Sequence, residues 1–207
     1  MDELPEIPGV REQWGRGVLH CPYCHGWEVR DRRIGVLVTS PMAVHKAFLF
    51  RQWSPQVMLF SGDHQVNDEE RLKLRALEIP VIDGAVSSLE LEDEEVTGVR
   101  LRDGRVIAVD AVVVATPMVA RIEPFAGIGL EPTLHPAGSY IETDAFGQTA
   151  VEGVWVAGNA TDIGAQVSGA AAAGALAAQH INTDLIDKDL DRAVAELDDA
   201  PTGRNNG

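Results

Sequence analysis

Two short apolar runs, separated by a stretch with helical spacing, constrain the fold of this chain most strongly. The first run, Ile34–Val38, is rich in β-branched residues and follows a polar cluster, which is typical of a buried strand. Apolar residues then recur at helical spacing over residues 42–53, and Ser54-Pro55 ends the pattern. Gln56–Phe60 indicates a second strand. A strand–helix–strand unit of this length predicts two parallel strands and an α/β fold.

The next stretch predicts a second helix and a third strand. Asp68–Leu77 is charged and amphipathic, and Asn67 or Asp68 is suited to be its N-cap. Ile79–Ile82 then returns to the pattern of a strand. These elements extend the α/β unit by one more repeat.

Residues 84–109 have the pattern of a different kind of sheet. Polar and apolar residues alternate there, which predicts an antiparallel meander, and Asp103-Gly104 is typical of a hairpin turn. Ala111–Thr116 is continuously apolar, as in a strand buried on both faces.

The character of the sequence changes after Thr116. Prolines and glycines interrupt about thirty residues, which indicates a crossover between domains with a boundary near Met118. Gly153–Gly158 predicts a buried strand, and Ala165–Leu185 predicts a helix of small residues that can pack closely on a sheet or ligand. Residues 186–207, rich in Asp and Ala, predict a frayed helix and a disordered tail.

Charge and composition exclude several classes of protein. The formal net charge is -15 over 207 residues, which argues against nucleic acid or an anionic membrane as a partner. No apolar stretch reaches the ~18 residues of a transmembrane helix, and the N-terminus lacks a basic region followed by an apolar run. We therefore expect a cytoplasmic protein.

The two cysteines, Cys21 and Cys24, are the sharpest chemical signal. Two thiols are too few for a disulfide framework, and in a reducing compartment their spacing favours a transient, catalytic bridge. At the start of a helix, free N–H groups and the helix dipole would stabilise the first thiolate, and the second thiol would resolve a mixed disulfide. His20 and His25 flank the pair and are suited to stabilise a thiolate or relay a proton.

Half of a zinc site is the alternative interpretation of this pair. Zinc requires four ligands, and the sequence holds no second pair of cysteines. The residues therefore favour redox chemistry and leave no metal site in the prediction.

The order of these motifs resembles that of the thioredoxin reductase family, in its low-molecular-weight form. Gly15-Arg16-Gly17-Val18 leads into a Cys-Pro-Tyr-Cys-His-Gly segment, the strand–helix–strand unit follows, and Gly-Val-Trp-Val-Ala-Gly-Asn precedes the small-residue helix. The resemblance covers residues 1–185 and is greatest to the branch whose dithiol reads Cys-Pro-Tyr-Cys. It implies a three-layer FAD/NAD(P)-binding, Rossmann-like domain over residues 1–117 and the C-terminal segment of a second, FAD-binding domain over residues 118–185.

The resemblance also implies cofactors and roles. FAD would pass electrons from NADP (or NAD) in its reduced form to the dithiol, with Cys24 facing the flavin and Cys21 attacking the external disulfide. The residues that would bind the flavin are Gly158, Asn159, Thr161, Asp162, Ala165, Gln166 and Val167. Asn159 stands where many members have Asp, so a hydrogen-bonding side chain remains but its charge does not.

The loop expected to bind the pyridine nucleotide departs from the family pattern. Its candidates are Thr39, Ser40, Met42 and Ala43 with Pro41 between them, where the family has GxGxxA or GxGxxG. The basic residues expected for a 2'-phosphate are replaced by a segment containing Asp63, which fits a 2'-hydroxyl better. Nucleotide binding therefore stays open.

The resemblance begins after the family's first flavin-binding segment and its GxGxxG loop. We expect the chain to be a fragment or to rely on a companion for that half, with weak FAD affinity alone. The leading hypothesis is an enzyme that passes electrons through the dithiol to a thioredoxin-like protein or a small-molecule disulfide, as a homodimer. A dithiol oxidase that uses oxygen and a non-catalytic binding domain are the alternatives.

Overall fold

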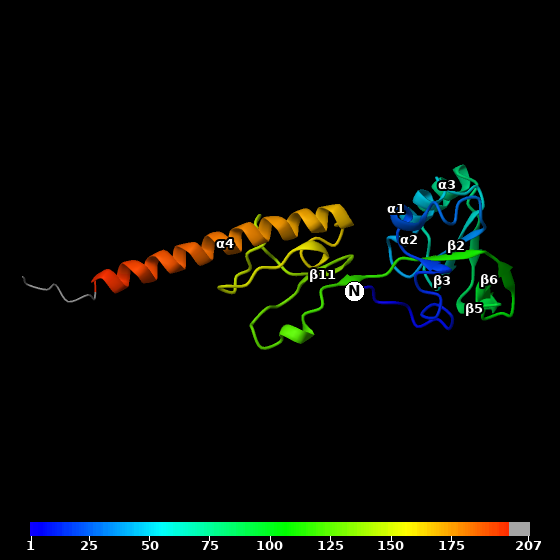
Figure 1. The fold of residues 1–207 in the computed structure, drawn as a ribbon. Coiled ribbons are helices and arrows are strands. Elements are labelled where there is room, and N and C mark those ends of the chain that lie inside the picture. The colour runs from blue at the N-terminus through cyan, green and yellow to red at the C-terminus, as the bar shows by residue number, and fades with distance from the viewer. Residues whose placement is uncertain (199–207) are drawn as a thin grey trace, which may run out of the picture. The chain divides into compact units, whose positions relative to one another are not determined.

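The computed structural model describes residues 1–198. The chain divides into two compact units, Asp2–Pro117 and a second that begins at Met118 and to which Met1 also belongs. Each unit is described here by itself, in the colours and labels of Figure 1.

A five-stranded parallel sheet forms the centre of the first unit. Its order is β1-β8-β2-β3-β4, and every neighbouring pair runs parallel. The strands are β1 (Val18–Leu19), β2 (Ile34–Leu37), β3 (Val57–Gly62), β4 (Val81–Asp83) and β8 (Ala111–Val114). The predicted parallel pairing of β2 with β3 is confirmed. The edge strand β1 was not predicted from the sequence, because a strand of two residues is too short to show a periodic pattern.

The helices cover one face of this sheet (Figure 1). They are α1 (Pro22–His25), α2 (Ala43–Phe50) and α3 (Asp68–Ala76). Asn67 is the N-cap of α3 and forms a reciprocal capping box with Glu70, so the predicted cap is confirmed. Their apolar side chains pack on Ile34, Val36 and the other residues of the same sheet face, which are fully buried.

The antiparallel meander covers the opposite face. It consists of β5 (Val86–Glu92), β6 (Glu95–Leu101) and β7 (Val106–Ala108), in that order. Leu37, Phe60 and Val112 point into the cluster that this meander shares with the parallel sheet. Alternate residues of β2 and β8 thus pack into two separate hydrophobic cores, one on each face of the sheet. The predicted three-layer α/β fold is confirmed.

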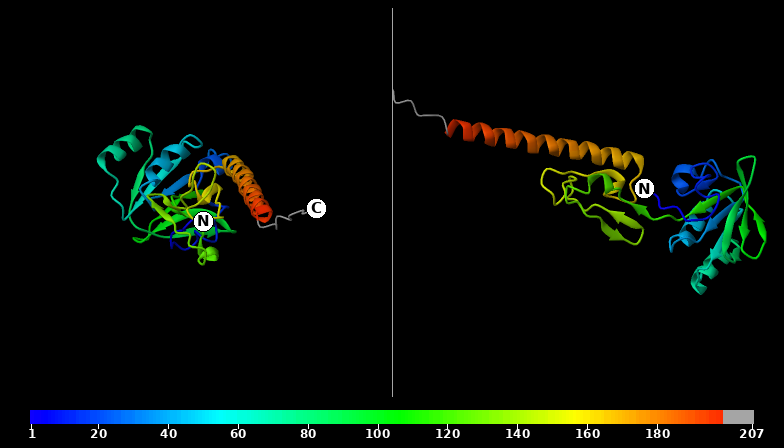
Figure 2. Two further views of the ribbon diagram at one scale, coloured as in Figure 1. Left: turned by 90° about the vertical axis from the view of Figure 1, so that its left-hand side faces the viewer. Right: turned by 90° about the horizontal axis from the view of Figure 1, so that it is seen from below.

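The second unit contains little regular structure besides one helix (Figure 2). Its elements are β9 (Met118–Val119), the 3-10 helix η1 (Glu123–Phe125), β10 (Thr133–His135), β11 (Gly138–Tyr140), the 3-10 helix η2 (Gly158–Ala160) and α4 (Val167–Asp198). The three short strands form a sheet of order β10-β11-β9.

Two predictions for this unit are wrong. The apolar run Gly153–Gly158 is not a buried strand: Trp155 makes a single bridge to Gln148, and residues 154–157 are only half-buried. The predicted fraying after Leu185 is also wrong, because α4 continues without a break to Asp198. The predicted tail beyond that residue lies outside the described part of the chain.

None of the helices within residues 1–198 combines the length and the apolar character needed to cross a membrane.

Candidate active site at the dithiol

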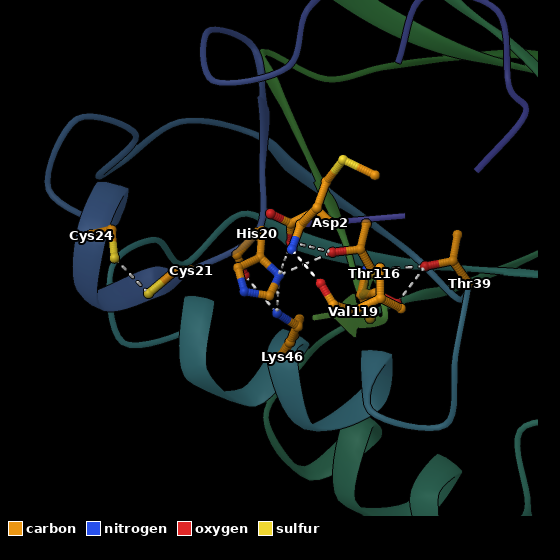
Figure 3. A network of polar contacts seen from close by, with 10 residues as sticks. Asp2, His20, Cys21, Cys24, Thr39, Lys46, Thr116 and Val119 are labelled. Carbon is orange, nitrogen blue, oxygen red and sulfur yellow. Dashed lines mark hydrogen bonds and ion pairs between the residues drawn. The ribbon is translucent and has the colours of Figure 1, made fainter. Parts of the chain in front are cut away.

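The strand β1 and the helix α1 together position the dithiol. Cys21 follows β1 by two residues and is the N-cap of α1, and Pro22 occupies the first turn, where a missing N–H is harmless. Cys24 lies in the same turn, and its Sγ donates a hydrogen bond to the Sγ of Cys21 at 2.9 Å (Figure 3). The predicted pair is therefore held face to face at a helix start.

The two thiols differ in their environments. Cys21 is half-buried and Cys24 is exposed. The hydrogen bond to Cys21, aided by desolvation and by the charge of a Cys21 thiolate, raises the pKa of Cys24 to about 11. Cys24 therefore keeps its proton at neutral pH, and Cys21 is the sulfur that accepts the hydrogen bond.

The helix dipole is weaker here than the sequence suggested. The helix α1 is four residues long, a single turn, and Cys21 makes no side-chain capping hydrogen bond. Because the dipole grows with the number of aligned peptide units, one turn supplies little of it. Another source of positive charge is needed to stabilise a thiolate at Cys21.

A polar network surrounds His20, next to the dithiol (Figure 3). Lys46 Nζ lies 3.1 Å from His20 Nδ1 and donates to the His20 carbonyl oxygen at 2.7 Å. Thr116 Oγ1 lies 3.3 Å from the same Nδ1 and donates to Asp2 Oδ1 at 2.7 Å. Since an ammonium group has only donors, Nδ1 accepts from Lys46, and the imidazole proton lies on Nε2.

Burial keeps this histidine neutral. Desolvation and the charge of Lys46 lower the pKa of His20, and Asp2 only partly opposes them. Asp2 Oδ1 lies 3.7 Å from His20 Nδ1, but a neutral imidazole makes no ion pair, so the hydroxyl of Thr116 is the effective partner of Asp2. Desolvation also lowers the pKa of Lys46, while the negative charges of Cys21 and Asp2 act in the opposite direction.

One small pocket of about 220 Å³ brings the predicted catalytic residues together. Its lining includes Cys21, Cys24, His20 and His25. The backbone N–H of His25 donates to the carbonyl oxygen of Cys21, and its side chain is exposed. Four residues chosen from the sequence thus share one cavity.

Three residues of this site were missed by the sequence analysis: Asp2, Lys46 and Thr116. Lys46 is a charged residue within the apolar run of α2, and Thr116 follows the carboxyl end of the buried strand β8, where parallel sheets place their sites. Both are signals that the sequence contains. Asp2 carries no such signal.

The loop from Thr39 to Ala43 fits a pyrophosphate poorly. Thr39 Oγ1 donates to the carbonyl oxygen of Ala115 at 3.2 Å and accepts from its N–H at 3.0 Å. Ser40 accepts hydrogen bonds from Met42 N through its side chain and from Ala43 N through its carbonyl, and Pro41 has no N–H. The backbone donors of Thr39, Met42 and Ala43 are already bonded and Pro41 has none, so the loop offers fewer donors to phosphates than a glycine-rich loop does.

A pocket of about 240 Å³ lies beside this loop, at the carboxyl ends of β2 and β3. Thr39, Asp63 and His64 line it together with apolar residues. The acidic Asp63 fits a ribose hydroxyl there, whereas most donors of the loop are not available to the phosphates. The first unit therefore matches a pyridine nucleotide only in part.

The stretch predicted to bind flavin uses most of its side chains internally. Asn159 donates to the carbonyl oxygen of Ala165, Thr161 to that of Gly158, and Asp162 accepts from Gly164. Val167 begins α4 and is 88% exposed, so the helix start is open to a ligand. Gln166 accepts from the N–H of Ala170. The open helix start fits a flavin, and the side chains hold the loop in shape.

Within residues 1–198, no three His, Cys, Asp or Glu residues are grouped to hold a metal ion.

Comparison with known proteins places this geometry in a family. The profile of the pyridine nucleotide-disulphide oxidoreductases matches residues 2–188. The chain is 29% identical to thioredoxin reductase tcpT of Claviceps purpurea over 89% of its own length and 60% of that protein.

Two solved structures are similar in both sequence and fold. HlmI is 44% identical with a TM-score of 0.86, over 95% of this chain and 61% of that one. An oxidoreductase from Agrobacterium tumefaciens is 31% identical with a TM-score of 0.80, over 90% and 62%. The chain thus spans about three fifths of the length of each of these three relatives. It belongs to the pyridine nucleotide-disulphide oxidoreductase family and is thioredoxin reductase-like.

Proposed function

We propose that the chain carries the redox-active dithiol of a flavin-dependent thiol–disulfide oxidoreductase. The observation that supports this most directly is the hydrogen bond from Cys24 to Cys21 inside a pocket that also holds His20 and His25. One sulfur is poised as an acceptor and its neighbour keeps a proton, which is the arrangement that thiol–disulfide exchange requires.

The exchange step follows from this asymmetry. The thiolate of Cys21 attacks one sulfur of a substrate disulfide, forms a mixed disulfide and releases the other substrate sulfur as a thiolate. Cys24 then loses its proton and attacks the sulfur of Cys21, which closes the Cys21–Cys24 disulfide and releases the second substrate sulfur. The substrate gains two electrons, which the dithiol loses, and two protons, one from Cys24 and one from the solvent. Exposed His25 is placed at the pocket to take up or return the proton.

A flavin, when bound, would return an electron pair to the Cys21–Cys24 disulfide. The open start of α4 and the loop Gly158–Asp162 are the parts of this chain suited to hold it. Full occupancy would also need a binding site for the adenosine diphosphate half, which we expect to come from a separate flavin-binding segment.

The direction of electron flow separates two versions of this function. A disulfide reductase, which the thioredoxin reductase relatives favour, would draw electrons from NADPH or NADH. A dithiol oxidase would run the exchange in reverse, take electrons from a substrate dithiol and reduce oxygen to hydrogen peroxide. The occupied donors of the Thr39–Ala43 loop favour the oxidase.

The substrate in either direction would be a thioredoxin-like protein or a small-molecule disulfide or dithiol. We propose a homodimer, as the family resemblance implies, and a cytoplasmic location, because free thiols persist in a reducing compartment.

A visible spectrum of the purified protein, recorded without oxygen, tests the function and its direction. A flavin band bleached by NADPH or NADH supports the reductase, and one bleached only by a dithiol supports the oxidase. If no flavin is bound and added FAD changes nothing, the chain is a fragment or a binding domain, and the proposal of flavin chemistry in this chain by itself is wrong.

Two cysteine variants test the division of roles. Cys21→Ser should abolish reduction of a disulfide dye, whereas Cys24→Ser should trap a mixed disulfide that mass spectrometry detects at Cys21. Full activity in both variants would contradict the dithiol assignment.

A further inference from the structure

Next to the dithiol pocket, Lys46 binds His20 and is a cation that the exchange chemistry above leaves without a role. The single-turn helix α1 supplies little dipole, and His20 is neutral, so neither provides a full positive charge beside Cys21. Lys46 does. It belongs to α2, whose other inward residues, Ala43, Val44 and Ala47, are buried and apolar.

The ammonium group of Lys46 is bound to the backbone that carries the dithiol. Its Nζ donates to the carbonyl oxygen of His20, the residue before Cys21, and to Nδ1 of the same histidine. Figure 3 shows the lysine reaching from α2 toward the end of β1, with Cys21 just beyond His20. The side chain is half-buried, so water screens its charge less than at the surface.

The charges of Lys46 and Cys21 are coupled. A negative charge at Cys21 raises the pKa of Lys46, against the effect of burial. Such coupling is reciprocal, because the same Coulomb energy favours the anion and the cation together. Asp2 also faces this group and favours the ammonium, but its own negative charge opposes a thiolate at Cys21. Cys24 and His25 complete the titratable lining of the pocket.

We propose that Lys46 is a positioning residue of the dithiol: its ammonium fixes the His20–Cys21 backbone and stabilises the thiolate of Cys21, while Asp2 limits that effect. The inference rests on the proposed function, in which the thiolate of Cys21 is the nucleophile. It places the electrostatic control of the site on α2 and away from the Cys-Pro-Tyr-Cys segment. His20 was predicted to stabilise a thiolate or relay a proton; in this proposal Lys46 stabilises the thiolate, and His20 is a neutral link between Lys46 and Thr116.

Alkylation of Cys21 measures the thiolate without any catalytic turnover. In the full-length Cys24→Ser background, Cys21 is the single cysteine and still has a hydroxyl donor beside it. The rate of its reaction with iodoacetamide is measured by mass spectrometry from pH 5 to 10. The pH at which this rate is half of its maximum, here called the midpoint, reports how readily Cys21 forms a thiolate. Lys46→Met should move this midpoint upward by about one pH unit, because the positive charge is lost. Lys46→Arg keeps the charge, so its midpoint should differ from that of the Lys46 protein by less than about a quarter of a pH unit.

Two further variants test the direction of the shift in the midpoint and serve as a control. Asp2→Asn should move the midpoint downward, since it removes a negative charge near Cys21. Lys73→Met, at an exposed lysine of α3 paired with Glu69, should leave it unchanged. Opposite shifts of the midpoint in Lys46→Met and Asp2→Asn distinguish an effect of charge from a loss of packing, which would not change sign between the two variants.

The outcomes separate this inference from the proposed function. A midpoint in Lys46→Met equal to that of Lys73→Met overturns the role of Lys46, even if the wild type reduces disulfides. Should Lys46→Met fail to fold, an unchanged midpoint in Asp2→Asn overturns it instead. Opposite shifts support the role of Lys46 even in a chain that shows no flavin chemistry, which would count against the proposed function alone.

Discussion

The two units of the molecule differ in how much of their apolar surface they bury. In Asp2–Pro117, both faces of the parallel sheet are covered, and residues such as Ile34, Phe50 and Phe60 are fully buried. In the second unit, the buried apolar residues among those described are Ala120, Ile141 and Ala177. Large apolar side chains remain exposed along its helix α4, among them Leu185, Leu190, Val194 and Leu197.

This difference indicates where the stability of each unit comes from. Burial of apolar surface is the dominant favourable term in folding, at about 25 cal/mol per Å². The first unit has two cores and paired strands of up to seven residues, whereas the strands of the second have two or three residues. We therefore expect the second unit to be the less stable of the two when each is taken by itself.

Separating the units should produce the largest effect. A fragment of residues 2–117 should unfold cooperatively in urea, because its cores lie entirely within it. A fragment of residues 118–207 should show helical circular dichroism without a cooperative transition. A sharp transition in the second fragment, with a slope as steep as that of the first, would contradict the comparison.

The same substitution in each unit should sharpen the contrast. Phe60→Ala removes a fully buried ring of β3 and should reduce the free energy of unfolding by about 3–5 kcal/mol. Phe125→Ala removes a ring that is 53% exposed and should change it by less than about 1 kcal/mol. Urea titration followed by far-ultraviolet circular dichroism measures both. Equal losses of the free energy of unfolding in the two variants would show that the exposure of the ring does not determine the effect of the substitution.

A pair of glycines tests packing at the dithiol. A Cβ added at Gly26, which caps α1, would clash with the indole of Trp53 and with the carbonyl oxygen of Pro22, so Gly26→Ala should destabilise the first unit by about 1–3 kcal/mol. Gly127 in the second unit has nothing within 4 Å of such a Cβ, and Gly127→Ala serves as the control. The melting temperature should fall only in the first variant. An unchanged value for both would contradict the clash, because both the indole of Trp53 and the backbone at Pro22 would then have to move at no cost.

The smallest effect is a pH dependence confined to the first unit. The pKa of His20 is lowered from 6.5 in the folded chain, mainly by burial, so below pH 6.5 the unfolded chain binds a proton that the folded chain resists. The free energy of unfolding should therefore stay level above that pH and decline as the pH falls. His20→Gln should flatten the decline, and His135→Gln, at an exposed histidine of the second unit, should not. The comparison fails here if both variants follow the wild-type curve.

Local signals were sufficient for most of the first unit. The β-branched runs of β2 and β8, the alternation in β5 and β6 and the cap at Asn67 each act within a few residues, and the structure contains them all. The same kind of signal was misleading at Gly153–Gly158. An apolar run becomes a strand only beside a partner strand, and Trp155 has one bridge, to Gln148.

The length of α4 was missed for another reason. Residues 186–198 are rich in Asp and Ala, which the sequence analysis took as a sign of fraying. Lys188 pairs with Asp184 at i−4, and Arg192 pairs with Asp189 at i−3, so the charges lie one turn apart along the helix. Such pairs add a few tenths of a kcal/mol each to an exposed helix. Residues 199–207 lie outside the described part.

The sequence by itself determined the spacing of the two cysteines, the α/β class and the order from β2 to β8 in the first unit, because each follows from residues near one another in the chain. Only the tertiary structure decided which charges surround the sulfurs. Asp2, Lys46 and Thr116 lie far apart in sequence, yet the fold brings them into one polar network around His20, beside the sulfurs. Electrostatic interactions depend on distance in space and on exclusion of water, and neither can be derived from spacing along a chain.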